Sequence, residues 1–111
     1  KVAVLKYAGR PSLELVRDQN ALGLLQGVFG DQFGAFEAYL GGGQTVVNVN
    51  GLLLAPGCRE DACASEKGLA VVDSAAGTAF GLVSSNGSVS YFGIEQTAVP
   101  AAVTEWISAN W

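Results

Sequence analysis

The apolar residues in the N-terminal part of the chain follow a helical spacing. The segment PSLELVRDQNALGLLQGVFG, residues 11–30, predicts either one helix or two helices with a break near residues 18–20. Gly23 and Gly27 weaken the helical pattern, because each glycine costs about 1 kcal/mol relative to alanine inside a helix. Gly30 is expected to end this helical segment.

A second apolar stripe occupies the segment DQFGAFEAYL, residues 31–40. Phe33, Phe36 and Leu40 are spaced to share one face of a helix. Asp31 is the expected N-cap, because its carboxylate can accept a hydrogen bond from the free backbone N–H groups of the first turn. Consecutive glycines follow and are expected to end the helix.

Beyond these glycines the apolar positions alternate with a period of two, which is typical of β-strands. Asn50-Gly51 and Asn86-Gly87 each predict a tight hairpin turn between two such segments. The pattern therefore predicts an antiparallel meander of about five strands, in the segments 44–50, 51–57, 68–74, 78–85 and 88–94.

The segment VPAAVTEWISAN, residues 99–110, predicts a closing helix, since Pro100 suits a first helical turn. The apolar face of this helix would consist of Val99, Val103, Trp106 and Ile107. Helices, then strands, then a helix are typical of an α+β fold, with the N-terminal helices and the C-terminal helix packed on one face of the antiparallel sheet. A length of 111 residues fits one domain, residues 1–111.

Composition narrows the classes of partner. Half of the residues are hydrophobic and 14% are charged, which is enough apolar material to fill a core. The net charge is −4 and the basic residues are scattered, which disfavours non-specific nucleic-acid binding and would suit a basic partner. The apolar runs are far too short to cross a bilayer. Because the chain begins at Lys1 and not at Met, we expect a trimmed mature form, whose residues 1–9 predict an extended arm or an edge strand.

The residue types present argue against catalysis. The chain has no histidine, so Ser-His-Asp and Cys-His arrangements are excluded, and two cysteines alone do not make a zinc site. Glycoside hydrolysis needs two carboxylates on opposite sides of a substrate bond, whereas Glu60 and Asp61 are neighbours on one short segment. The sequence GGGQT lacks the lysine of a phosphate-binding loop. We therefore expect no enzyme activity, no metal and no cofactor.

The two cysteines, Cys58 and Cys63, enclose a short polar stretch. A disulfide between them would close so small a ring that the chain-entropy estimate gives only about 2 kcal/mol of stability. Local rigidity is the stronger motive, because a loop that is ordered in advance loses less entropy on binding. A stapled turn without a partner stays open as an alternative. A redox pair is disfavoured, since redox motifs hold two residues between the cysteines, and a disulfide would indicate an oxidising compartment.

The run LLLAPGCREDACASEKGLAVVDS, residues 52–74, resembles the centre of the Ivy family, the bacterial periplasmic inhibitors of vertebrate C-type lysozyme. In that family one strand enters a disulfide-closed loop of the form Cys-x4-Cys and another strand leaves it. Cys58 and Cys63 match the loop, and residues 69–72 match the outgoing strand. The resemblance extends more loosely to the next two strands, and to the helices by the order of elements.

This resemblance implies a helix-covered antiparallel sheet, frequent homodimers, and a loop that enters the lysozyme cleft as a plug. The partner would be a lysozyme-type glycoside hydrolase, and the location would be the periplasm or another exported, oxidising compartment. The inhibitory loop would consist of Cys58, Arg59, Glu60, Asp61, Ala62 and Cys63, with Cys58 and Cys63 as its disulfide.

The loop departs from the family pattern at its centre. The family's usual loop has the sequence Cys-Lys-Pro-His-Asp-Cys, and its His contacts the two catalytic carboxylates of the enzyme. In this chain the four inner positions are held, in order, by Arg59, Glu60, Asp61 and Ala62. Asp61 therefore stands at the His position, where an ionised carboxylate cannot donate a hydrogen bond and would be repelled by two other carboxylates.

Three interpretations stay open. In the first, Arg59 replaces the His with a fork of donors, and Glu60 and Asp61 turn to basic residues on the rim of the cleft. In the second, the target is a different cell-wall hydrolase, or a toxin for which this chain is the immunity partner. In the third, the loop has lost inhibition and the chain is a structural or interaction domain of the same fold.

Overall fold

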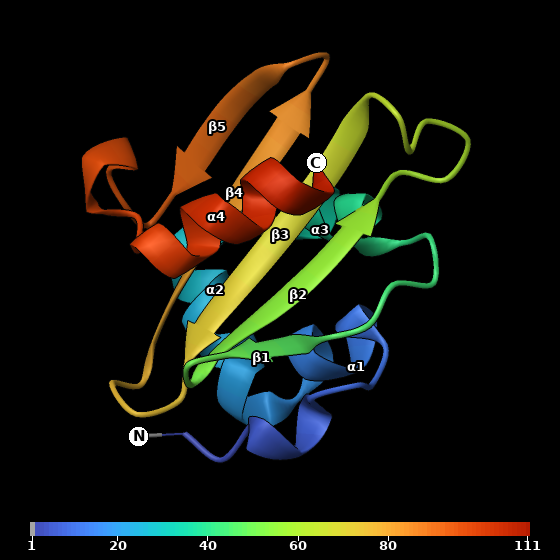
Figure 1. The fold of residues 1–111 in the computed structure, drawn as a ribbon. Helices are drawn as coiled ribbons and strands as arrows, with labels where there is room; N and C mark the ends of the chain where they lie inside the picture. The colour runs from blue at the N-terminus through green and yellow to red at the C-terminus, as the bar shows by residue number, and fades with distance from the viewer. Residues whose placement is uncertain (1) are drawn as a thin grey trace.

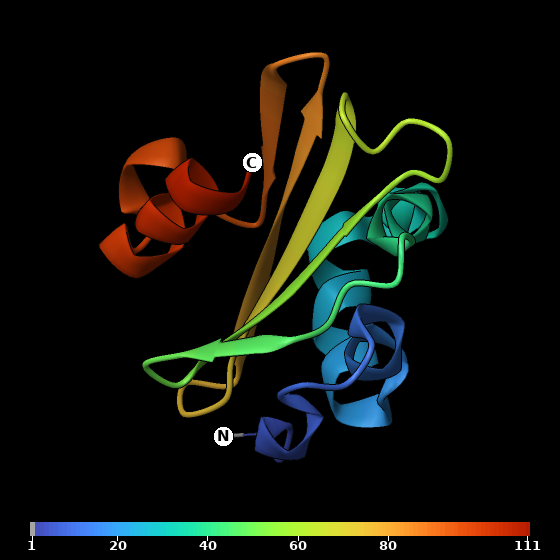
Figure 2. The same cartoon turned by 45° about the vertical axis from the view of Figure 1, so that its right-hand side comes forward.

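The computed structural model describes residues 2–111. A five-stranded antiparallel sheet in the order β1-β2-β3-β4-β5 forms the centre of the molecule, with helices on both sides (Figures 1 and 2). The strands are β1 Val47–Val49, β2 Leu52–Cys58, β3 Glu66–Asp73, β4 Thr78–Ser85 and β5 Ser88–Phe92. The expected α+β class and the meander of five strands are confirmed.

The helices lie before and after the sheet in the sequence. The α-helices are α1 Ser12–Arg17, α2 Gln19–Phe29, α3 Phe33–Glu37 and α4 Ala101–Asn110. Short 3₁₀ turns are η1 Leu5–Tyr7, η2 Gly30–Gln32, η3 Ala38–Leu40 and η4 Gln96–Ala98. No helix within residues 2–111 is long and apolar enough to cross a membrane.

The N-terminal helical segment is broken at Asp18. Of the two predictions, one helix or two helices with a break near residues 18–20, the second is confirmed. Asp18 has an extended backbone, and its side chain accepts a hydrogen bond of 2.8 Å from the N–H of Asn20, which caps α2. Gly30, with a φ of +56°, ends α2 as predicted. The expectation that Asp31 caps the next helix was wrong, because Asp31 lies inside η2 and α3 begins after Gln32 without a side-chain cap.

Both predicted hairpin turns are present. Asn50 and Gly51 have φ angles of +52° and +88°, and Asn86 and Gly87 have φ angles of +51° and +86°. Two successive residues with positive φ are typical of the two-residue hairpin turn that matches the twist of antiparallel strands. The Asn-Gly pairs therefore set the register of β1 on β2 and of β4 on β5.

The sheet is covered on both faces, so the expectation of helices on one face was wrong. Figure 2 shows α4 on one side of the sheet and the N-terminal helices on the other. The strand β3 explains this arrangement, because Leu69, Ala70, Val71 and Val72 are consecutive and all 0% exposed. Ala70 and Val72 pack with the N-terminal helices, whereas Leu69 and Val71 pack with Val103 of α4.

Residues 2–9 contain the 3₁₀ turn η1 and no strand, so this segment is an arm and not an edge strand. The N–H of Val2 donates to the carbonyl of Ser74 at 2.8 Å, and the N–H of Gly9 donates to the carbonyl of Val46 at 2.8 Å. Lys1 lies outside the described residues.

Candidate functional site

The cysteine loop joins β2 to β3 at the end of the sheet where the β4–β5 turn also lies (Figure 1). Cys58 and Cys63 form a disulfide with their Cα atoms 4.8 Å apart. Cys58 ends β2 and is buried, whereas Cys63 is exposed. The disulfide therefore ties an exposed loop to the buried end of a central strand.

Backbone hydrogen bonds order the loop from within. The N–H of Ala62 donates to the carbonyl of Arg59 at 3.1 Å, which closes a four-residue turn. Asp61, at the third position of this turn, has a φ of +68°, a conformation that aspartate tolerates better than most residues with a side chain. The N–H of Arg59 donates to the carbonyl of Glu66 at 3.0 Å, which continues the strand pairing into the loop.

Two further hydrogen bonds hold the outgoing side of the loop. The N–H of Glu66 donates to the carbonyl of Ala62 at 2.8 Å. The N–H of Asn86, in the β4–β5 turn, donates to the carbonyl of Ser65 at 2.8 Å. The loop is thus braced by the disulfide, by its own turn and by the neighbouring hairpin.

The charged side chains of the loop are all exposed, but they do not point in the same direction. The guanidinium carbon of Arg59 lies over the ring of Tyr39, 5.5 Å from its centroid. Glu60 leans toward Gly41, since a Cβ placed on Gly41 would lie 3.5 Å from the Cγ of Glu60. Asp61 occupies the turn itself, and Ala62 is half-buried.

The base of the loop rests on two glycines that face each other across β2 and β3. Gly57 pairs with Gly68, and both are buried. A Cβ on Gly68 would lie 2.7 Å from the Cβ of Tyr39 and 2.8 Å from its carbonyl oxygen, and a Cβ on Gly57 would overlap the backbone of Leu40. The missing side chains leave a notch, defined by Gly57 and Gly68, in which the backbone of η3 lies.

A shallow groove of about 330 Å³ runs beside the loop. Its lining comes from α1, from the α3–η3 segment and from the loop, and consists of Leu13, Glu37, Ala38, Gly41, Arg59 and Glu60. Glu37 is already paired with Arg17, whose Nε lies 3.2 Å from the carboxylate. The groove therefore presents both signs of charge next to the loop.

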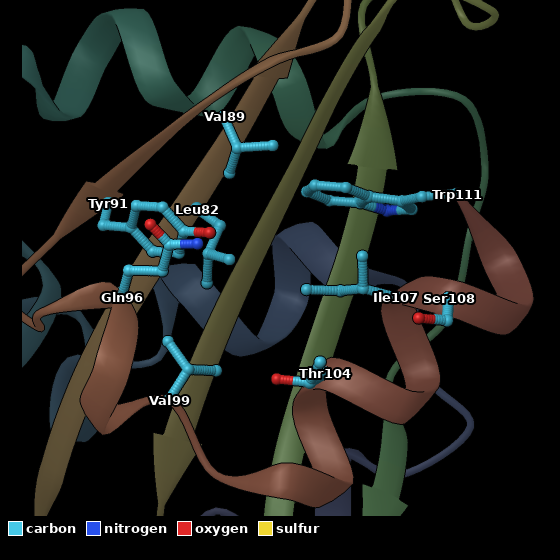
Figure 3. Close-up of a pocket in the computed structure, with 9 residues that line it drawn as sticks. All are labelled: Leu82, Val89, Tyr91, Gln96, Val99, Thr104, Ile107, Ser108 and Trp111. Atoms are coloured by element: carbon cyan, nitrogen blue, oxygen red, sulfur yellow. The ribbon is translucent and has the colours of Figure 1, made fainter.

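A second hollow, of about 220 Å³, lies between α4 and the edge of the sheet (Figure 3). Ile107 and Trp111 face Val89 of β5 across it, with the hydroxyls of Thr104 and Ser108 on the helix side. Its lining residues include no carboxylate, so the hollow offers no acid–base pair for glycoside cleavage. Within residues 2–111 no three His, Cys, Asp or Glu side chains are grouped so that they could hold a metal ion.

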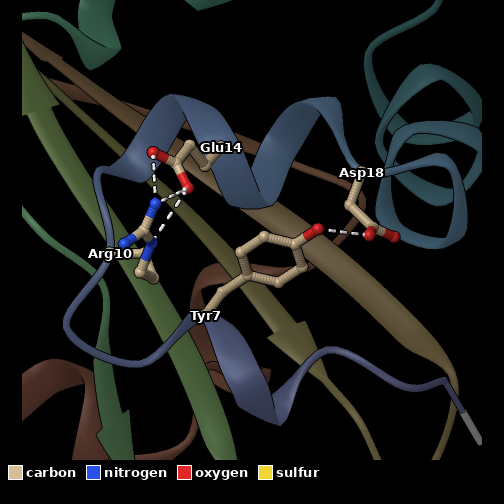
Figure 4. Close-up of polar contacts among 4 residues, drawn as sticks. All are labelled: Tyr7, Arg10, Glu14 and Asp18. Atoms are coloured by element: carbon tan, nitrogen blue, oxygen red, sulfur yellow. Dashed lines mark hydrogen bonds and ion pairs between the residues drawn. The ribbon is translucent and has the colours of Figure 1, made fainter.

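A polar cluster near the N-terminus ties the arm to the first helices (Figure 4). The hydroxyl of Tyr7 donates to a carboxylate oxygen of Asp18 at 2.5 Å, and Arg10 pairs with Glu14 at 2.9 Å. The hydrogen bond from Tyr7 lowers the pKa of Asp18, and the same bond raises the pKa of Tyr7. The role of this cluster is therefore structural, because it holds the N-terminal arm against the first helices.

The fold and the site define a small α+β protein that presents one rigid, disulfide-closed polar loop from the end of a two-sided sheet. The family model described as "Inhibitor of vertebrate lysozyme (Ivy)" matches residues 24–110, and the chain belongs to this family. The family is one of lysozyme inhibitors and not of enzymes. Membership in it supports a protein partner of the lysozyme type for this chain. Comparison with curated proteins found no match, and comparison with solved structures found none either.

The sequence drew attention to the loop but not to what supports it. The only two cysteines of the chain indicated the loop, and the disulfide is present as expected. Tyr39, Gly57 and Gly68 were not singled out from the sequence. The signal available was the glycine placed just before the first cysteine, which is an unusual residue for the interior of a buried strand.

Proposed function

We propose that this protein inhibits a lysozyme-type peptidoglycan hydrolase by inserting the loop from Cys58 to Cys63 into the active-site cleft of the enzyme. The observation that carries the proposal is the braced, exposed loop in a chain that belongs to a lysozyme-inhibitor family. The contact residues are Arg59, Glu60 and Asp61, all exposed at the end of the sheet.

The rigidity of the loop supports a plug. A flexible loop would lose backbone freedom on entering a cleft, at a cost of roughly 1–2 kcal/mol for each residue that is ordered. In this chain the disulfide and the hydrogen bond from Ala62 to Arg59 order the loop before any partner arrives. Less of the favourable interaction free energy is then offset by the ordering of the loop, and binding is tighter.

Arg59 supplies the donors that the loop would otherwise lack. The catalytic residues of a glycoside hydrolase are carboxylates, and a guanidinium can bind a carboxylate through two parallel hydrogen bonds. Asp61 cannot serve this purpose while it is ionised, because it only accepts hydrogen bonds. We assign Arg59 to a carboxylate of the target, and Glu60 and Asp61 to basic or neutral donors on the rim of its cleft.

The remaining features of the proposal follow from the same reasoning. The disulfide fits an oxidising compartment, and we place the protein in the periplasm or in another exported location. Residues 1–111 would form a single inhibitor domain, and a homodimer is the assembly that the family resemblance favours.

Titration of a vertebrate C-type lysozyme with the purified protein tests the proposal. Residual hydrolysis of bacterial cell walls should fall as the protein is added, and it should reach a floor near equimolar amounts if binding is tight. Arg59→Ala should weaken inhibition, whereas Arg10→Ala, which truncates an exposed arginine outside the loop, should not. An enzyme that keeps its full rate at micromolar excess of the protein would exclude the C-type target.

Asp61 favours a second candidate, namely a different hydrolase or a toxin whose cleft presents a positive group. A carboxylate at the centre of the loop would be attracted to such a cleft and repelled from one that holds two carboxylates. Pull-down with the intact protein and with Asp61→Asn separates the two candidates. A partner that is retained only by the intact protein supports this second candidate.

A further inference from the structure

We propose that Tyr39 of η3 is a positioning residue for Arg59, so that the inhibitory surface extends beyond the disulfide loop to η3. This inference rests on the proposed function for its effect on a target, although the positioning itself concerns this chain alone. Tyr39 and Arg59 are twenty positions apart in the sequence, and the fold brings the aromatic ring under the guanidinium.

The position of Tyr39 is set by the sheet and not by the loop. The backbone of η3 lies in the notch of Gly57 and Gly68, where a Cβ on Gly68 would lie 2.7 Å from the Cβ of Tyr39. Immediately before η3 in the sequence, the helix α3 is anchored by Phe36, which is 3% exposed and stacks on Phe29 with the ring centroids 3.9 Å apart. The ring of Tyr39 therefore starts from a backbone that has little freedom to shift.

The guanidinium of Arg59 uses one face and leaves its edges available. Its carbon lies 5.5 Å from the centroid of the Tyr39 ring, within the range of a cation–π contact. Within residues 2–111, the side chain of Arg59 makes no hydrogen bond and no ion pair. A guanidinium that rests on an aromatic face can still offer its N–H edges to a carboxylate through two parallel hydrogen bonds.

The consequence is that part of the ordering cost of Arg59 is removed before binding. An arginine side chain has many rotamers, and fixing them on binding reduces affinity. The contact with Tyr39 selects one orientation in the free protein. Because an exposed cation–π contact is modest, loss of the aromatic ring should weaken inhibition by about two- to fivefold, which is the effect of the usual strength of such a contact.

The experiment compares the inhibition constant against C-type lysozyme for the intact protein, Tyr39→Phe, Tyr39→Leu, Arg59→Ala and the double variant Tyr39→Leu with Arg59→Ala. Tyr39→Phe keeps the ring and should inhibit like the intact protein, whereas Tyr39→Leu should show the two- to fivefold loss. In the Arg59→Ala background the change at Tyr39 should have no further effect, because the group that it positions is gone. Equal losses for Tyr39→Phe and Tyr39→Leu, or the same loss in both backgrounds, would overturn the proposal.

A second measurement needs no target. The Cδ protons of Arg59 should show a ring-current shift in the proton NMR spectrum of the intact protein and of Tyr39→Phe, and the shift should disappear in Tyr39→Leu. If the intact protein fails to inhibit the enzyme, the proposed function fails, and this shift alone decides whether Tyr39 positions Arg59. Arg59 resonances that are the same in all three proteins would overturn the positioning role.

Discussion

Gly57 and Gly68 face each other across β2 and β3, and the backbone of η3 occupies the space where their side chains would be. This pair connects the central sheet to the loop, because Gly57 is followed at once by Cys58. The same two glycines therefore belong to the pairing of β2 with β3 and to the contact of the sheet with η3.

Gly68→Ala should lower the free energy of unfolding by about 1–3 kcal/mol, the usual cost of an added group in a packed core. The new Cβ would lie 2.8 Å from the carbonyl oxygen of Tyr39, and backbone atoms cannot move aside as the end of a flexible side chain can. Denaturant unfolding followed by circular dichroism measures the change.

Gly23→Ala is the matched control, with the opposite sign. Gly23 lies in α2, where an added Cβ would meet no atom within 4 Å. Alanine favours the helix, so the free energy of unfolding of this variant should rise by up to about 1 kcal/mol. Equal effects of the two substitutions would show that the notch does not constrain η3.

The parts of the fold that depend on neighbouring residues were predictable. Asn50-Gly51 and Asn86-Gly87 specify their turns through the positive φ angles that those residue types accept, so the hairpins were visible in the sequence. The presence of helices on both faces of the sheet was harder to predict, because the apolar stripe of α4 does not determine which face of the sheet the helix packs against. The unbroken apolar runs of residues 52–55 and 69–72 pointed to two buried faces, since a half-exposed strand alternates.

The candidate site likewise has one part that was predictable from the sequence and one part that was not. The loop was predictable because its chemistry is local: two cysteines at a short spacing around charged residues. The contact between Tyr39 and Arg59 was not predictable, since it depends on where η3 lies on the sheet and not on any pattern within either segment. Asp31 shows the limit within one segment, because a good capping residue was overridden by the tight turn of η2.

Removal of the disulfide should weaken inhibition while the protein stays folded. Cys58→Ala combined with Cys63→Ala opens a small ring, so the free energy of unfolding should fall by only about 2 kcal/mol on the chain-entropy estimate. The loop would keep its turn and its bond to Glu66 but would sample more conformations, and the inhibition constant should rise at least tenfold. Thermal unfolding and lysozyme titration are measured on the same samples, and an unchanged inhibition constant in a folded double variant would show that the disulfide is only a local brace.

The bond between Tyr7 and Asp18 should make stability depend on pH in two ranges. It lowers the pKa of Asp18 below its ordinary value of 3.8, so its stabilisation is present above pH 3.8 and is lost as the pH falls through the folded value. It raises the pKa of Tyr7 above 10.0, so its stabilisation is present below pH 10.0 and is lost as the pH rises through the folded value.

Tyr7→Phe should therefore be less stable than the intact protein across the neutral range, and the difference should shrink at both extremes. Denaturant midpoints measured from about pH 3 to about pH 11 give this profile. Tyr91→Phe is the control, because no side-chain hydrogen bond involves the Tyr91 hydroxyl within residues 2–111. A Tyr7→Phe deficit that stays constant at every pH would contradict the assignment of the pKa changes to this bond.

Asp61 decides which target the loop fits, and two substitutions at this position test it. Asn and His both tolerate a positive φ, so Asp61→Asn and Asp61→His should leave the turn and the thermal stability unchanged. If the cleft holds two carboxylates, each substitution removes a repulsion, and Asp61→His also adds a donor where the family usually has one. Inhibition of C-type lysozyme should then strengthen by about tenfold or more for Asp61→His, with Asp61→Asn intermediate. Weaker inhibition by both variants would mean that a donor on the rim of the cleft binds the Asp61 carboxylate, and it would refute the expected repulsion between Asp61 and the two carboxylates of the cleft.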